Sequence, residues 1–198
     1  MLIVNRVFRI LCTNSNDCVL IAVRILFATY LLMYTRESDL VRDFVSLLRS
    51  NFTPWPDLDV AFEFDYQAGR VDVIGANIFR DLFSFEAKLT RWREALHQAY
   101  RNTSFSHHSY VVLPESTAQK AIAYCHEFEI REVGLCSVGH SGIVLEIPSS
   151  RQHPILTWLT GNALEYIIQV NKTKLASEAH DTEPAFNAAD CRGVQQVQ

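Results

Sequence analysis

Hydrophobic residues recur at helical spacing near the start of the central part of the chain. In residues 37–51 (ESDLVRDFVSLLRSN), Val41, Phe44 and Leu48 follow an i, i+3, i+7 pattern, so they share one face of a helix. The next segment, residues 53–57 (TPWPD), holds two prolines, which cannot continue a helix. We therefore predict one amphipathic helix that ends before these prolines.

Three strand-like segments, rich in β-branched and aromatic residues, follow this helix. They are residues 58–66, 70–75 and 82–89. The glycine in residues 67–69 (QAG) favours a hairpin turn between the first two segments. Residues 76–81 then connect the second segment to the third. The pattern predicts a meander of three strands.

The second half of the chain alternates predicted helices with predicted strands. Helices are expected at residues 90–102, 116–128 and 153–170, and strands at 110–113, 133–138 and 142–147. Thr90 is the expected N-cap of the first of these helices, and Pro114 should end the first of these strands. A meander followed by a helical crossover to a new strand predicts a mixed central sheet flanked by helices, which is an α/β fold.

The composition fits one globular domain with extensions. Of the 198 residues, 48% are hydrophobic and 20% are charged, and the formal net charge is −4. This charge excludes a histone-like or basic-tailed protein, so any nucleic-acid binding must use a local basic face. The five cysteines are scattered without CxxC spacing, which indicates free thiols in a reducing compartment. We expect a cytoplasmic protein.

The two ends of the chain differ from this central part. Residues 1–35 are an apolar N-terminal extension, in which Arg24 would cost roughly 2.5–3.5 kcal/mol in the middle of a membrane-spanning helix. A packed helix, an upstream extension with translation starting at Met33, and a membrane anchor are the three interpretations. We favour the first two and expect no membrane partner. Residues 171–198 have little apolar surface to bury, which predicts a disordered tail.

The strongest chemical signal lies in two neighbouring predicted strands. Glu86 and Lys88 are two residues apart in one strand, so their side chains should point to the same face. Asp72 lies between two valines in the preceding strand. If the two strands pair in antiparallel fashion around residues 77–80, Asp72 comes beside Glu86.

Such a cluster has the groups that phosphodiester hydrolysis needs. Two carboxylates in a partly buried sheet repel each other, and a divalent cation removes that conflict. Their oxygen ligands suit Mg²⁺ or Mn²⁺. Lys88 can position a water and stabilise the negative charge that develops on the phosphate. In the alternative interpretation, Glu86 and Lys88 are a solvated surface pair and Asp72 is a charge beside a turn.

These residues resemble the PD-(D/E)XK nuclease superfamily, which has a restriction-endonuclease-like fold. The resemblance covers about residues 36–148 and includes the segments 69–75 (GRVDVIG), 83–89 (FSFEAKL), 92–100 and 110–114. Val71 stands where the nominal motif has a proline, a departure that many members share. The strand at residues 133–138 also looks like small bacterial members of the group, some of them linked with DNA repair. The resemblance implies a nuclease-like domain at residues 36–148, followed by a C-terminal helix within 149–170.

The resemblance also implies roles for individual residues. Asp72 and Glu86 would hold Mg²⁺ or Mn²⁺, helped by the backbone carbonyl of Ala87. Lys88 would be the catalytic lysine. Glu37 takes the place of a catalytic glutamate that many members carry on the first helix.

Other candidates each have an alternative interpretation. Glu37 lies four residues before Val41 on the apolar stripe of its helix, but it equally suits a first-turn glutamate favoured by the helix dipole. Gln98 matches a helix glutamine that faces the site in some subfamilies, and a solvated glutamine is the alternative. Lys88 and three arginines form a local basic cluster next to the proposed site. The arginines, Arg91, Arg93 and Arg101, are candidates for phosphate contacts, and a solvated helix face is the alternative.

The sequence thus predicts a Mg²⁺-dependent deoxyribonuclease, an endonuclease of DNA repair or processing. RNA as a substrate and a homodimeric state stay open, and no small-molecule cofactor is expected. The competing hypothesis is a catalytically inactive module of the same fold that binds nucleic acid or protein.

Overall fold

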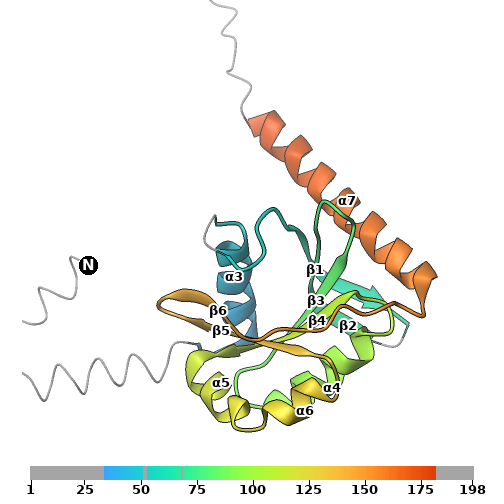
Figure 1. Ribbon diagram of the computed structural model, residues 1–198. Helices are drawn as coiled ribbons and strands as arrows, with labels where there is room; N and C mark the ends of the chain where they lie inside the picture. Colours follow the sequence, from blue (N-terminus) through green and yellow to red (C-terminus); the bar gives the residue numbers. More distant parts are fainter. Residues whose placement is uncertain (1–33, 51–52, 68, 182–198) are drawn as a thin grey trace, which may run out of the picture.

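One six-stranded sheet forms the centre of the molecule (Figure 1). The computed structural model describes residues 34–50, 53–67 and 69–181. The strands are β1 (Asp59–Tyr66), β2 (Gly69–Ala76), β3 (Leu82–Ala87), β4 (His108–Pro114), β5 (Gly134–Gly139) and β6 (Gly142–Ile147). They lie in the sheet in the order of the chain.

The pairing of these strands is mixed. β1, β2 and β3 form the predicted antiparallel meander. β3, β4 and β5 run parallel to one another, and β6 returns antiparallel to β5. Each parallel step needs a crossover, and helices supply both crossovers. The predicted α/β class, with a mixed central sheet flanked by helices, is confirmed.

Alternate residues of the strands face two different cores. One face carries α3 (Glu37–Leu48), whose Leu40 and Phe44 pack on Phe83 and Phe85 of β3. The opposite face carries α4 (Trp92–Asn102) and α5 (Glu115–Ile122), which pack over buried strand residues of β4 and β5, namely Val111, Leu113 and Leu135. A short helix, α6 (Cys125–Glu129), follows α5.

The long C-terminal helix, α7 (Thr157–Asp181), covers the β1–β2 end of the sheet (Figure 1). Its Leu159 and Ile167 pack against Phe64 of β1 and Ile74 of β2. Ile74 alternates with Val73, which belongs to the core under α3. The helix therefore lies on the same face of the sheet as α4.

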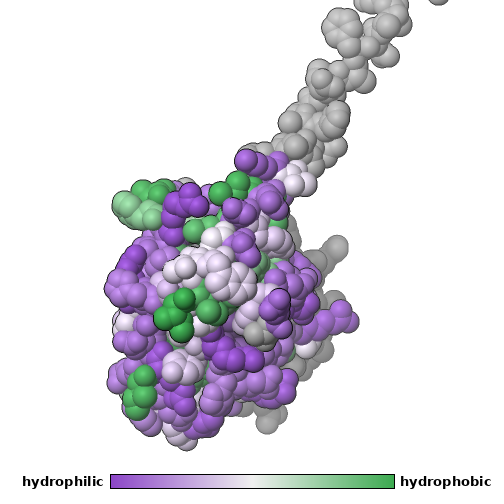
Figure 2. All heavy atoms as spheres, turned by 90° about the vertical axis from the view of Figure 1, so that its right-hand side faces the viewer, coloured by the Kyte–Doolittle hydropathy of each residue, from purple (hydrophilic) through white to green (hydrophobic). Residues whose placement is uncertain are grey.

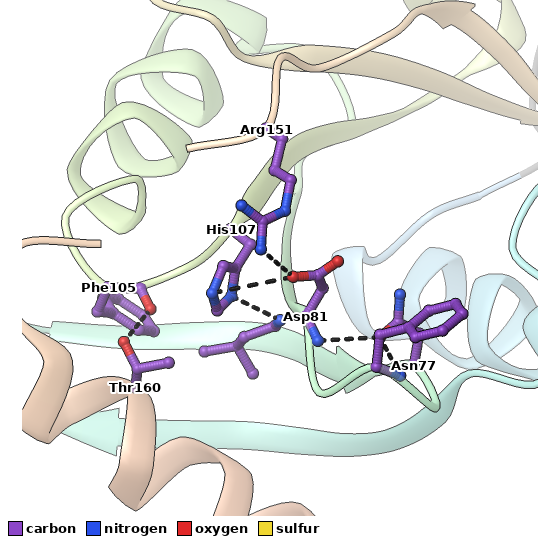
Figure 3. Close-up of polar contacts among 8 residues, drawn as sticks. Asn77, Asp81, Phe105, His107, Arg151 and Thr160 are labelled. Carbon is purple, nitrogen blue, oxygen red and sulfur yellow. Dashed lines mark hydrogen bonds and ion pairs between the residues drawn. The ribbon is translucent and has the colours of Figure 1, made fainter. Parts of the chain in front are cut away.

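The linker before α7 is fixed to the sheet by polar contacts. Nη2 of Arg151 lies 2.7 Å from Oδ1 of Asp81, and Nε2 of His107 lies 3.9 Å from the same oxygen (Figure 3). The amide of Leu156 donates to the carbonyl of Ser104 over 2.9 Å. These contacts hold the first turn of α7 close to the end of α4.

The helices differ from the prediction chiefly in three respects, apart from α3, which ends at Leu48 instead of residue 51. Arg91, not Thr90, is the N-cap of α4, because the carbonyl of Arg91 accepts the first helical hydrogen bonds. The single helix expected at residues 116–128 is broken into α5 and α6. The break lies at Tyr124, whose ring packs 5.4 Å from that of Trp92.

The third difference concerns the C-terminal helix. It begins at Thr157 instead of residue 153, because the amide of Leu156 donates to the carbonyl of Ser104, two residues after α4. It continues to Asp181, so the prediction of a disordered tail is wrong for residues 171–181. The rest of that tail, and the apolar segment up to Met33, lie outside the described residues. Among the helices that the structure describes, none is long and apolar enough to cross a membrane.

Candidate active site

Asp72 is fixed where β2 and β3 stop pairing. The last paired residues are Val73 and Phe85, and the same register continued by one residue would pair Asp72 with Glu86. Instead, Oδ2 of Asp72 accepts a hydrogen bond from the backbone amide of Ala87 over 2.9 Å. The carboxylate therefore sits against the stretch of backbone that joins Glu86 to Lys88.

Glu86 is held in the interior by a side-chain amide. Only 2% of Glu86 is exposed. Its Oε1 accepts a hydrogen bond over 2.7 Å from Nδ2 of Asn102, the last residue of α4. Oδ1 of Asn102 in turn accepts a hydrogen bond over 3.1 Å from the hydroxyl of Tyr66, at the end of β1. Three elements thus fix one carboxylate oxygen.

Lys88 follows the last residue of β3. Its backbone amide donates to the carbonyl of Val112, which keeps it beside β4. Its Nζ lies 3.1 Å from Oε2 of Glu37, the first residue of α3, and the lysine is 8% exposed. The structure therefore brings the predicted Glu37 to the predicted Lys88.

Glu86 and Lys88 bond to helices on opposite faces of the sheet, α4 and α3 respectively. Their side chains therefore do not share one face of the sheet, contrary to the expectation from strand alternation. They are joined by Asp72, which is bonded to the backbone between them, and by electrostatics. The charges of Asp72 and Lys88 both act on the carboxyl of Glu86. Asp72, Glu86 and Lys88 thus all lie at the end of β3.

The pKa values of both carboxyls are raised above their ordinary values. Burial, and then the charge of Asp72, raises the pKa of Glu86 to about 8, against the opposing effects of Asn102 and Lys88. Burial also raises the pKa of Asp72, while the amide of Ala87 and the charge of Lys88 lower it. A buried acid whose ionisation is suppressed by a neighbouring carboxylate belongs to a site that gains from a bound cation.

The donor set of this site fits Mg²⁺ or Mn²⁺. Within the described residues, hydrogen bonds use Oδ2 of Asp72 and Oε1 of Glu86, and none uses Oδ1 or Oε2. The N–H and C=O of one strand residue face the same neighbouring strand, so the carbonyl of Ala87 faces the Asp72 side. Carboxylate and carbonyl oxygens are ligands that these hard cations prefer.

Protein side chains alone do not complete such a site. Across residues 34–50, 53–67 and 69–181, no group of three or more His, Cys, Asp or Glu side chains is arranged to hold a metal. A cation here would take its remaining ligands from water and from a substrate oxygen. That is the usual coordination of Mg²⁺ in proteins that act on phosphates.

Gln98 lies one helical turn before Asn102, on the same side of α4. Its Oε1 is buried and, among the described residues, has no hydrogen-bond partner. A buried acceptor of this kind calls for an explanation, such as a water or an ion. The position agrees with the predicted orientation of Gln98 toward the sheet.

The three predicted phosphate-binding arginines have different environments. Arg91 pairs with Glu94 over 2.8 Å. Arg93 pairs with Glu127 over 2.9 Å and lies over the rings of Trp92 and Tyr124. These two are engaged in contacts on the α4–α6 surface.

Arg101 differs from the other two arginines. It forms no ion pair with any described residue, and its charge lowers the pKa of Glu86 and counteracts the rise in the pKa of Tyr66. Of the three arginines, Arg101 is the one whose charge acts on Glu86.

The sequence patterns did not point to Asn102 or Tyr66. Asn102 marked only the end of a helix, and Tyr66 only the end of a strand. One signal was present, because Asn102 follows Gln98 by four residues and so shares its helix face.

Comparisons with known proteins identify the fold alone. No model of a known protein family matches this sequence, and no curated protein matches it. Among solved structures, the chain is similar to a protein of unknown function from Silicibacter pomeroyi, with a TM-score of 0.54 and 12% sequence identity. The match covers 76% of this chain and 97% of the other.

Proposed function

We propose that this chain is a metal-dependent phosphodiesterase that cleaves DNA and uses Asp72, Glu86 and Lys88. The proposal rests mainly on the carboxylate of Asp72 bonded to the backbone between Glu86 and Lys88. The raised pKa values of both carboxyls give further support, since a divalent cation would offset the cost of ionising two buried carboxyls. The resemblance to PD-(D/E)XK nucleases points the same way.

Each residue has a defined part in this mechanism. Asp72 and Glu86, with the carbonyl of Ala87, would hold Mg²⁺ or Mn²⁺. When bound, such a cation supplies positive charge to the phosphate and makes a water more acidic. Lys88 neutralises charge that develops on the phosphate oxygens during attack by water. Glu37 holds the lysine ammonium in place, and Asn102 holds Glu86.

The experiment is cleavage of single- and double-stranded DNA by purified variants with Mg²⁺ or Mn²⁺. Asp72→Ala and Lys88→Met should each lower the rate by about 100-fold or more. Asp59→Ala, at the exposed start of β1, and Lys120→Met, exposed on α5, are matched controls that should keep the wild-type rate. An Asp72→Ala protein that cleaves as fast as wild type would overturn the proposal.

A catalytically inactive module that binds nucleic acid or protein is the second candidate. It is favoured by the ion pair between Lys88 and Glu37 and by the lack of a third acidic or histidine ligand among the described residues. Titration with Mn²⁺ separates the two candidates. A catalytic site binds Mn²⁺ through Asp72 and Glu86, and the binding disappears in Asp72→Ala. A role in DNA repair or processing is part of the nuclease hypothesis. RNA as an additional substrate and a homodimeric state stay open.

A further inference from the structure

A groove lies beside the candidate active site, between the end of α4 and the start of α7. Its volume is about 700 Å³. Tyr66 and Arg101 line it on one side, and His153, Ile155 and Trp158 on the other. The start of α7 is at the right of Figure 1, so this side of the molecule faces the viewer in Figure 2, where hydrophobic patches interrupt a hydrophilic surface.

Flat aromatic side chains stand open to solvent in this groove. Tyr100 is 51% exposed and Trp158 is 58% exposed. Ile155, which also lines the groove, is 81% exposed. Exposed aromatic rings of this kind stack well against nucleobases, whatever the base, because every base has a flat π-face.

The charge of the groove complements an anion. Arg101 lines it and has no ion-pair partner among the described residues, and the lining contains no Asp or Glu. The neighbouring groove along α7 differs, because Asp65 and Glu165 line it. Aromatic surfaces together with an unpaired guanidinium are the two features that proteins combine to bind single-stranded nucleic acid.

Hydrogen bonds connect this groove to the carboxylates. Tyr66 lines the groove, and its hydroxyl is bonded to Asn102, which donates to Glu86. Arg101 is the neighbour of Asn102 in α4, and its charge acts on both Tyr66 and Glu86. The groove is therefore two hydrogen bonds away from Glu86, although none of Asp72, Glu86 and Lys88 lines it.

We propose that this groove holds unpaired nucleotides of the substrate, with bases stacked on Tyr100 and Trp158 and a phosphate paired with Arg101. The inference rests on the proposed function and narrows its substrate to nucleic acid with a single-stranded segment. Bases inside a duplex are stacked on one another, so their faces cannot reach these rings.

The test measures binding of oligothymidylate to the full chain in the presence of a chelator, so that no cleavage occurs. Trp158→Ala, Tyr100→Ala and Arg101→Gln should each weaken binding by about 10-fold, and Trp158→Phe should restore most of it. Phe79→Ala and Arg80→Gln, on the exposed turn between β2 and β3, are matched controls that should bind like wild type. A duplex of matched length should bind more weakly and respond less to the aromatic substitutions.

Each outcome of this test is decisive. The proposal is overturned if wild type and the aromatic variants bind equally, or if no oligonucleotide binds at all. It is also overturned if the aromatic substitutions weaken duplex binding as much as single-strand binding. Oligouridylate in place of oligothymidylate tells RNA from DNA. Because the assay contains no metal, Asp72→Ala should bind the oligonucleotide normally, so a failure of the proposed hydrolysis is distinguishable from a failure of the groove.

Discussion

The side-chain amide of Asn102 donates a 2.7 Å hydrogen bond to Oε1 of Glu86, and both residues are almost fully buried. This bond links the last residue of α4 to β3 and fixes one carboxylate oxygen of Glu86. Asn102 touches no substrate in the proposed mechanism. It is a positioning residue whose effect passes through Glu86.

Substitution of Asn102 therefore tests how the site is held. Asn102→Ala should weaken Mn²⁺ binding by about 10-fold or more, the usual effect of losing a partner that orients a metal ligand. Tyr66→Phe, which removes only the bond to Asn102, should have a smaller effect. Calorimetric titration with Mn²⁺ measures both, and Asn162→Ala on the exposed side of α7 is the control. Unchanged Mn²⁺ affinity in Asn102→Ala would show that Glu86 needs no such support.

The raised pKa of Glu86 predicts how stability depends on pH. Its folded pKa of about 8 lies above the ordinary value of 4.5. The stabilising contribution of the protonated carboxyl is therefore complete below about pH 4.5 and is lost as the pH rises through about 8. Glu86→Gln cannot ionise and keeps an oxygen for Asn102.

Glu86→Gln should thus unfold with a free energy that is higher than that of wild type at alkaline pH, by an amount on the order of a few kcal/mol. Below about pH 4.5 the two proteins should be similar. Denaturant unfolding over a pH series measures the difference. A wild-type protein with the same alkaline stability as Glu86→Gln would contradict a buried Glu86 whose ionisation is suppressed. Added Mn²⁺ should reduce the difference, because a cation favours the ionised carboxylate.

The register of β2 and β3 could be predicted from the sequence because it depends on local features. The alternation of apolar residues around Asp72 and the spacing of the turn at residues 77–80 together place Asp72 opposite Glu86. The structure has that register up to the adjacent pair of Val73 and Phe85. The divergence of the strands at Asp72 is set by its side-chain bond to Ala87, and no local pattern encodes it.

The parts of the structure that the sequence did not reveal depend on contacts between distant segments. The break before α6 contains neither proline nor glycine, and it coincides with the packing of Tyr124 on Trp92. Arg93 looked available for phosphate, but Glu127 from another helix pairs with it. Asn102 reaches Glu86 only because α4 crosses back over β3. Side-chain periodicity reports the face of a helix, not the angle at which it crosses a sheet.

Glu37 offers a test of the lysine environment. Glu37→Gln keeps an oxygen for the ammonium of Lys88 but removes the neutralising charge, so the rate of cleavage should fall by about 10-fold with little change in folding. Asp39→Asn is the matched control, because it removes another carboxylate from the first turn of α3 and so reproduces any effect on the helix dipole. Equal rates for the two variants would show that Glu37 acts only through the dipole of α3.

His107 predicts a second, separate dependence on pH. Its Nδ1 accepts the backbone amide of Leu82 over 2.9 Å (Figure 3), which only an unprotonated nitrogen can do. Burial lowers its pKa below the ordinary 6.5, although the charge of Asp81 opposes this. The contribution of the neutral ring is therefore present above about pH 6.5 and is lost as the pH falls through the folded pKa.

Replacement of His107 separates the hydrogen bond from the titration. In His107→Asn the side-chain oxygen takes the place of Nδ1, so the folding free energy at neutral pH should change little while its decrease in acid becomes shallower. His107→Phe leaves the amide of Leu82 without an acceptor, which should cost about 1–3 kcal/mol at neutral pH. This cost relative to wild type should shrink in acid, because the protonated wild-type ring cannot accept the amide either. His108, whose pKa burial also lowers, keeps its own share of the acid sensitivity in both variants. The exposed His97→Asn is the control, and an acid profile of His107→Asn that matches wild type would remove His107 as the cause.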